Sequence, residues 1–200
     1  MTGSAPSSSY LSESGPSMRA FVAIELPEEL RRTLAREQAR FSAVCPDARW
    51  TRPEGIHLTL KFLGQISDEQ VAEVKKALGR IGRFPKFTAR AQGYGFFPDA
   101  KRPRVFWVGL DAPPDLAMLA KRVEAAMADI GFPPENRSFS PHLTLARFKV
   151  PRPQPKLQEL LAQQENQVLG TFEVSEFFLW ESKLSPKGAE YRKVAHFPLE

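Results

Sequence analysis

The chain has only one cysteine, Cys45, and three histidines, His57, His142 and His196, among its 200 residues. A single cysteine excludes an intramolecular disulfide and is typical of a reducing compartment, so we expect a cytoplasmic protein. No run of roughly 18 apolar residues occurs, and the sequence therefore predicts no transmembrane helix. The composition, 42% hydrophobic and 26% charged, is typical of a globular protein long enough to form a core without a disulfide or metal.

The N-terminal segment 1–17 has few apolar side chains and is rich in serine, glycine and proline. Such a segment cannot bury enough surface to offset the entropy lost on ordering. It also lacks the basic start and apolar core of a secretory signal. We therefore predict a disordered tail over 1–17 and one folded domain over 18–200.

The net charge of +5, from 28 Lys and Arg against 23 Asp and Glu, favours polyanionic partners such as nucleic acid, although the excess is small. Four arginines recur along one predicted helix, at Arg31, Arg32, Arg36 and Arg40. They indicate a solvated helix face that is also suited to contact with RNA.

Two of the three histidines lie in the same short sequence word, a four-residue motif that occurs twice. His-Leu-Thr-Leu occurs at 57–60 and again 85 residues later at 142–145. The flanking segments repeat in the same order at offsets of 85 or 86, with 21–30 resembling 107–116 and 87–90 aligning with 172–175. These matches predict two structurally similar halves, roughly 19–103 and 104–200.

Each half is predicted to contain a strand, a helix, a histidine-bearing strand, a second helix and a third strand. The strands are expected at 20–26, 56–63 and 86–96, then at 104–110, 141–148 and 171–182, the last followed by a turn. The helices are expected at 28–43 and 68–80, where 67–70 fits a capping box, then at 114–130 and 155–166. This order predicts an α+β fold with sheets packed against helices.

The repeated words place polar side chains on one face of each histidine strand. Residues i and i+2 of a strand share a face, so His57, Thr59 and Lys61 are predicted to point together. Leu58, Leu60 and Phe62 are predicted to point to the opposite face, toward the core. His142 and Thr144 share a face in the same way, and an approximate two-fold axis would bring both pairs into one cleft.

Two histidines in one cleft suit acid–base chemistry at phosphorus. One imidazole can deprotonate the nucleophile while the other protonates the leaving oxygen, on opposite faces of an in-line displacement. Thr59 and Thr144 can donate to the non-bridging oxygens, and Arg147 offers a guanidinium shaped for phosphate. Strict alternation places Arg147 on the face opposite His142, so it reaches the cleft only if the strand twists, bulges or ends near Ala146.

Other interpretations of these residues remain open. The two histidines could serve symmetric core packing, or the three histidines could ligate zinc, although no HxxxH or His-x-His word occurs. We expect neither a metal nor a cofactor. The tryptophans Trp50, Trp107 and Trp180 are expected to serve packing, and Cys45 to be structural.

Four segments resemble the two-histidine (2H) phosphoesterase superfamily, and most closely its RNA 2′,3′-cyclic phosphodiesterase branch, also called the LigT or 2′-5′ RNA ligase family. They read RAFVAI at 19–24, WTRP at 50–53, IHLTLKFLG at 56–64 and PHLTLAR at 141–147. The likeness runs from about residue 18 to the end of the chain.

The resemblance implies a bilobal fold of two pseudo-symmetric halves, each with an antiparallel sheet packed against helices, around a central cleft. It implies metal-independent hydrolysis of a 2′,3′-cyclic phosphate, on RNA ends or cyclic nucleotides, to the 2′-phosphate, with His57 as proton donor and His142 as proton acceptor. Thr59, Thr144 and Arg147 would hold the phosphate. Arg104 and Tyr191 fall in segments that resemble cleft-lining family segments.

The reverse reaction would join a cyclic-phosphate end to a 5′-hydroxyl, a reversible 2′-5′ ligation that the resemblance also implies. Two alternatives stay open: a non-catalytic nucleotide- or RNA-binding module, and a phosphoesterase acting on another cyclic phosphate such as ADP-ribose 1″,2″-cyclic phosphate. Nothing in the sequence indicates a membrane or an obligate protein partner, and we expect a monomer.

Overall fold

The computed structural model of the chain describes residues 17–81, 83–164, 167–185 and 188–200. The predicted tail therefore lies outside the described residues except for Ser17, which begins the first strand, and the division into tail and domain stays a prediction. The helices are α1 (Glu28–Ser42), α2 (Asp68–Gly79), α3 (Pro114–Ala128) and α4 (Pro155–Ala162), with a 3₁₀ turn at Pro53–Gly55. The strands are β1 (Ser17–Glu25), β2 (Ala48–Trp50), β3 (His57–Ser67), β4 (Phe87–Phe97), β5 (Val105–Asp111), β6 (His142–Phe148), β7 (Val168–Val174), β8 (Glu176–Ser185) and β9 (Gly188–Pro198).

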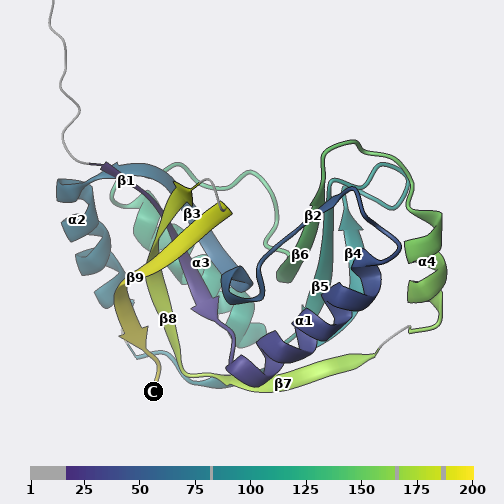
Figure 1. The fold of residues 1–200 in the computed structure, drawn as a ribbon. Coiled ribbons are helices and arrows are strands. Elements are labelled where there is room, and N and C mark those ends of the chain that lie inside the picture. The colour runs from purple at the N-terminus through teal and green to yellow at the C-terminus, as the bar shows by residue number, and fades with distance from the viewer. Residues whose placement is uncertain (1–16, 82, 165–166, 186–187) are drawn as a thin grey trace, which may run out of the picture.

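The strands form two antiparallel groups that meet at one point. Their order is β7-β4-β5-β6-β3-β1-β8-β9, with β2 paired to the outer part of β6. Between β3 and β6 the register joins a single residue pair, Leu58 with Leu143. The first lobe therefore holds β3, β1, β8 and β9, and the second lobe holds β7, β4, β5, β6 and β2 (Figure 1).

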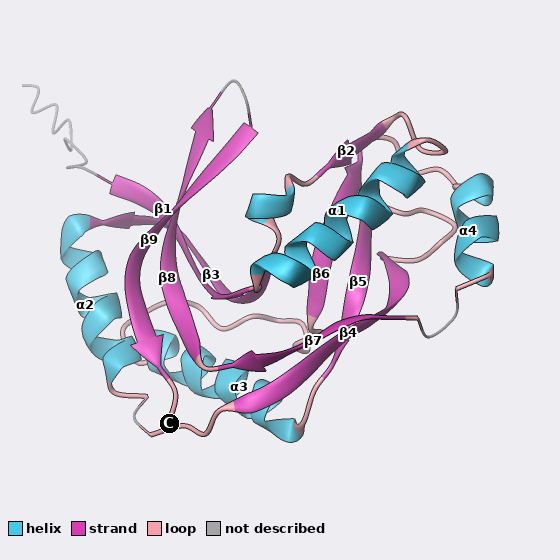
Figure 2. Cartoon of the chain, turned by 60° about the horizontal axis from the view of Figure 1, so that its bottom comes forward, coloured by secondary structure: helices cyan, strands magenta, loops and turns pink. Residues whose placement is uncertain are grey.

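The helices cross between the lobes. Helix α1 follows β1 of the first lobe but contacts β7 and β2 of the second, whereas α3 follows β5 of the second lobe and contacts β3 and α2 of the first. Figure 2 shows α2 and α3 together on one lobe and α1 and α4 on the other. The predicted bilobal α+β fold is confirmed, and each lobe draws on both sequence halves.

Most predicted elements are present with small shifts at their ends, but the C-terminal third differs. The strand predicted over 171–182 is two strands, β7 and β8, which separate at Ser175 and enter different lobes. A continuous run of strand-forming residues carries no signal of where the chain changes sheet. The predicted turn is followed by β9, an edge strand whose charged residues hide the alternation of apolar and polar side chains. The helix predicted over 155–166 ends at Ala162.

Local signals for the helices are realised in the structure. Gln70 N donates to Ser67 Oγ at 3.3 Å and Ser67 N donates to Gln70 Oε1 at 2.9 Å, which completes the predicted capping box of α2. Leu30, Leu34 and Phe41 bury the apolar face of α1.

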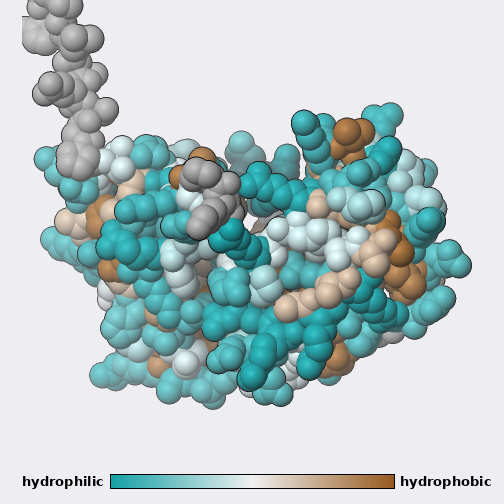
Figure 3. All heavy atoms as spheres, in the orientation of Figure 1, coloured by the Kyte–Doolittle hydropathy of each residue, from teal (hydrophilic) through white to brown (hydrophobic). Residues whose placement is uncertain are grey.

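The face of the molecule in Figure 3 is mostly hydrophilic, with hydrophobic areas scattered among teal side chains.

Both histidine strands contain a β-bulge immediately after the His-x-Thr word. In β3 the register skips Leu60, because Thr59 pairs with Ala23 and the next paired residue is Lys61. In β6 it skips Leu145, because Thr144 pairs with Trp107 and the next paired residue is Ala146. An extra residue in one strand reverses the alternation of faces beyond it.

The bulges correct two predictions about side-chain direction. Lys61 does not share the face of His57, because the bulge turns it into the core, where its side chain is 2% exposed. Phe62 does not face the core and is 55% exposed. Sequence alternation alone cannot anticipate this inversion.

Each bulge is secured by one polar side chain of a crossing helix, from α3 at the bulge of β3 and from α1 at the bulge of β6. Lys61 Nζ donates to Glu124 Oε1 on α3 at 2.7 Å and to the Pro133 carbonyl at 2.7 Å. Gln38, the α1 residue 86 positions before Glu124, is buried and donates from Nε2 to the Leu145 carbonyl at 2.9 Å and the Thr51 carbonyl at 2.7 Å. The repeat thus extends from the histidine words to the groups that fix their strands.

We predict that Glu124→Leu lowers the free energy of unfolding by about 3 kcal/mol, because it leaves the buried Lys61 ammonium without its carboxylate. Urea denaturation measures the change. The matched control is Glu73→Leu on the exposed face of α2, which is expected to alter stability by less than about 0.5 kcal/mol. Equal effects of the two substitutions would contradict the role of the buried pair.

Candidate active site

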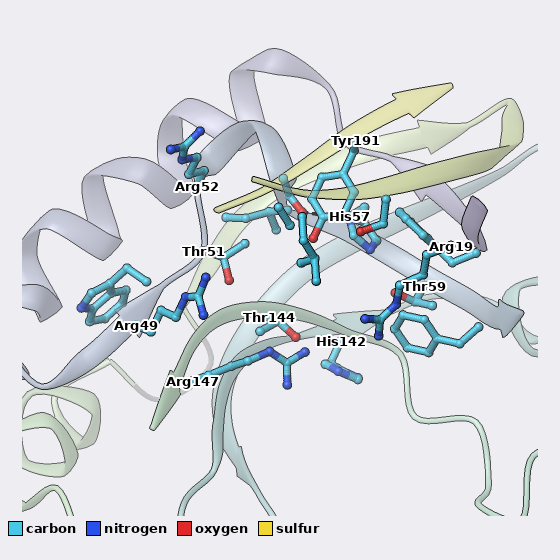
Figure 4. A pocket seen from close by; sticks show the side chains of 18 of the residues that line it. Arg19, Arg49, Thr51, Arg52, His57, Thr59, His142, Thr144, Arg147 and Tyr191 are labelled. Atoms are coloured by element: carbon cyan, nitrogen blue, oxygen red, sulfur yellow. Dashed lines mark hydrogen bonds between the residues drawn. The ribbon is translucent and has the colours of Figure 1, made fainter. Parts of the chain in front are cut away.

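A pocket of about 560 Å³ lies where β3 and β6 meet. Its walls come from β1, β3, β8 and β9 of the first lobe and from β2 and β6 of the second. All five residues predicted for the site line it: His57, Thr59, His142, Thr144 and Arg147 (Figure 4). The two halves of the chain therefore do bring their repeated words into one cavity.

His57, the first residue of β3, is held by its Nδ1 atom. That nitrogen lies 2.8 Å from the Gly55 carbonyl oxygen. The ring stacks on Phe21 with centroids 4.6 Å apart and lies nearly perpendicular to the ring of Tyr191, with centroids 5.3 Å apart. Since a carbonyl oxygen only accepts, Nδ1 carries the hydrogen, and Nε2 is the nitrogen available for proton transfer.

His142, the first residue of β6, has the same arrangement. Its Nδ1 atom lies 2.8 Å from the Ser140 carbonyl, the counterpart of Gly55 at the 85-residue offset. The ring of Phe97 lies nearly perpendicular to the imidazole, with centroids 4.8 Å apart. Both histidines therefore have the same tautomer in their neutral form, with Nε2 as the acid–base atom.

The surroundings of the two histidines favour their neutral form. Burial lowers the pKa of His57 from 6.5 to about 4, and the positive charge of Arg147 and the nearby His142 add to the effect, while the bond to Gly55 opposes it. Burial likewise lowers the pKa of His142, and Arg147 again adds to it. No aspartate or glutamate is among the described residues that line the pocket, so the site favours an anionic ligand.

Arg147 reaches the pocket because of the bulge at Leu145, which turns it to the face of His142 and Thr144. The irregularity near Ala146 that its participation requires is therefore present. The residue at the equivalent place in β3, 85 positions earlier, is Phe62, which also lines the pocket. The symmetry of the site is broken at this position, with a cation on one side and an aromatic ring on the other.

The remaining predictions have mixed outcomes. Tyr191 lines the pocket, whereas Arg104 is not among its lining residues. His196 is exposed on β9, with Nδ1 3.3 Å from Glu176 Oε2, outside the site. Across the described ranges no cluster of three or more His, Cys, Asp or Glu side chains is placed to hold a metal ion.

Sequence reasoning missed part of the lining. Arg19, Arg49, Arg52 and Phe62 contribute to the pocket but lie outside the repeated His-x-Thr words. All four stand in or beside the segments that resemble the family, which was the available signal. Their direction depends on strand register, which the sequence does not specify.

Paired Nε2 atoms, hydroxyl donors and a guanidinium around one small cavity can move protons on both sides of a phosphoryl group. Together with the internal duplication, they define a phosphoesterase of the two-histidine class. A family model described as "LigT like Phosphoesterase" matches the chain twice, at residues 24–107 and 108–191. The chain belongs to this family.

Curated relatives and solved structures agree with this assignment. A protein of Methanothermobacter thermautotrophicus named RNA 2′,3′-cyclic phosphodiesterase is 33% identical, over 91% of this chain and 99% of its own length. One of the same name from Aquifex aeolicus is 38% identical, over 76% and 81%. A crystal structure of a Thermus thermophilus protein matches with a TM-score of 0.77 and 32% identity, covering 91% of this chain and 98% of that one. E. coli LigT complexed with 3′-AMP matches with a TM-score of 0.75 and 28% identity, covering 92% and 99%.

We predict that, in the free protein, His57 titrates with a pKa of about 4 and His142 titrates below 6.5, as followed by NMR of the imidazole C–H signals. Adding inorganic phosphate is expected to raise the pKa of both, because an anion in the cleft stabilises each imidazolium. His57→Asn and His142→Asn assign the two signals. A titration midpoint at or above 6.5 without phosphate, or no response to phosphate, would contradict this account.

Proposed function

We propose that the protein hydrolyses the 2′,3′-cyclic phosphate at the end of RNA, or on a cyclic nucleotide, to a 2′-phosphate. The observation that carries the proposal is the pair of imidazoles with Nδ1 bonded to a backbone carbonyl and Nε2 left for chemistry. Hydrolysis uses two groups that can each give or take a proton, whereas simple binding needs neither. The curated relatives named above support the choice of RNA 2′,3′-cyclic phosphate as substrate.

In the proposed reaction His142 Nε2 takes a proton from water as its oxygen bonds to phosphorus. The bond from phosphorus to the 3′-oxygen breaks, and His57 Nε2 gives its proton to that oxygen. The product carries a 2′-phosphate and a free 3′-hydroxyl, and the two histidines have exchanged protonation states. A proton transfer between solvent and each imidazole then restores the starting state.

The other side chains hold charge. Thr59 and Thr144 donate to the non-bridging oxygens, and Arg147 balances the negative charge of the phosphoryl group. The lowered pKa of His57 makes its imidazolium a strong acid. A bound phosphate is an anion beside the ring and therefore raises that pKa, which favours the protonated form that donates. No step in this scheme uses a metal or a cofactor.

We also propose that the enzyme acts as a monomer in the cytoplasm. The lone Cys45 is buried, which is consistent with a reducing compartment. None of the helices in the described part of the chain is long and apolar enough to span a membrane. Reverse 2′-5′ ligation would use the same groups, with a 5′-hydroxyl in place of water.

We predict that His57→Ala and His142→Ala each lower the turnover of 2′,3′-cyclic AMP at least about 10³-fold, because each removes a proton-transfer group. His196→Ala, which removes the third histidine outside the pocket, is the matched control and keeps wild-type turnover. Circular dichroism confirms that all three variants are folded. The product is expected to be the 2′-phosphate, identified by ³¹P NMR.

Other results would overturn the proposal in distinct ways. Saturable nucleotide binding without hydrolysis of any 2′,3′-cyclic substrate would indicate a binding module. Faster turnover of ADP-ribose 1″,2″-cyclic phosphate than of every RNA substrate would assign that compound, rather than RNA, as the substrate. Loss of activity in excess chelator, restored by zinc, would exclude the scheme without a metal.

A further inference from the structure

Two arginines of the catalytic pocket, Arg49 and Arg147, differ from many other arginines of this protein in how their charge is balanced. Seven arginines outside this pocket form ion pairs with carboxylates: Arg31, Arg32, Arg40, Arg83, Arg90, Arg152 and Arg192. Arg49 and Arg147 line the pocket and form no ion pair with any described carboxylate. Their positive charge is therefore available to a ligand.

Arg49 and Arg147 are direct cross-strand neighbours. Arg49 in β2 pairs in register with Arg147 in β6, and both residues are exposed on the face that lines the pocket. Opposed side chains of an antiparallel pair start roughly 5 Å apart at Cβ, and like charges in this position destabilise the sheet. Anionic groups bound beside both guanidiniums would remove this repulsion.

Their shared position is fixed by contacts that do not involve either guanidinium. Gln38 donates to the carbonyls of Leu145 and Thr51, and Thr51 N donates to the Leu145 carbonyl at 2.8 Å. These bonds tie the end of β2 to the bulge of β6. The backbone that carries Arg49 is therefore held next to Arg147 before any ligand binds.

The reacting phosphate can be held without Arg49. A cyclic phosphodiester carries one negative charge and two non-bridging oxygens, which Thr59, Thr144 and Arg147 can satisfy together. Arg49 adds a second cation beside this set. In Figure 4, Arg49 and Arg147 extend from the same side of the cavity, while Arg19 lies at its opposite end beyond the histidines.

We propose that Arg49 forms a second phosphate subsite, which binds the 5′-phosphate group of the nucleotide whose cyclic phosphate reacts. In an RNA chain this group is the phosphodiester that joins the last nucleotide to the one before it. The subsite makes an RNA end a better substrate than a free cyclic nucleoside phosphate. The inference rests on the proposed function, since it assumes that the cyclic phosphate occupies the histidine site.

The test compares two substrates that differ by one phosphate: 2′,3′-cyclic AMP and the same compound with a 5′-phosphate. For the wild type we expect kcat/KM to be about tenfold higher with the 5′-phosphate, mainly through a lower KM. Arg49→Gln removes this preference, so that the ratio of the two kcat/KM values falls to about one. It also makes kcat/KM for the 5′-phosphorylated substrate fall less steeply as the salt concentration rises.

Arg83→Gln is the matched control, because it removes the same charge from an exposed ion pair with Glu200 outside the pocket, and it keeps the wild-type ratio. A wild type without the preference would overturn the inference. An unchanged ratio in Arg49→Gln would overturn it too, and an equal loss on both substrates would place Arg49 at the reacting phosphate instead.

A failure of the proposed function is recognised separately, because the wild type would then hydrolyse neither substrate. In that case calorimetry compares the binding of 2′-AMP with that of adenosine 2′,5′-bisphosphate. Tighter binding of the bisphosphate by the wild type, lost in Arg49→Gln, still supports the second phosphate subsite. Equal binding of the two nucleotides overturns it.

Discussion

The arrangement of the cleft depends on one contact, the antiparallel pairing of Leu58 with Leu143. The two leucines are counterparts in the internal repeat, so the approximate two-fold axis of the molecule passes between them. His57 and His142 stand next to this pair, each at the start of its strand, and are therefore presented to the same cavity from opposite sides. Because the register joins no other residues of β3 and β6, the two sheets diverge beyond it and leave room for a substrate.

The helices and bulges turn this contact into a site. Each long helix crosses to the other lobe and carries a polar residue, Gln38 or Glu124, that secures the strand just after the His-x-Thr word. The bulges then bring Arg147 and Phe62 to the histidine face, although simple alternation would bury both. A symmetric scaffold thus supports an asymmetric site, which matches a reaction in which one histidine gives a proton and the other takes one.

The repeated word was enough to predict the histidines, the threonines and their convergence, because strand periodicity and duplication are written in the order of residues. The same periodicity misplaced Lys61 and Phe62, since a bulge is decided by packing against β1 and α3, far away in the chain. The split between β7 and β8 and the exchange of helices between lobes also depend on tertiary contacts. Arg49 could not be assigned from the sequence, because its proximity to Arg147 is a property of the register between β2 and β6.

The central claim is that His57 is the acid and His142 the base, and a substrate with sulfur in place of the 3′-oxygen tests it most directly. A thiolate leaves without a proton, so the need for a general acid disappears while the need for a base remains. The account predicts that His57→Ala hydrolyses this 3′-thio cyclic substrate within about tenfold of the wild-type rate, whereas His142→Ala stays inactive. Recovery of His142→Ala with His57→Ala inactive would reverse the two roles, and recovery of neither would contradict the proton-donor role of His57.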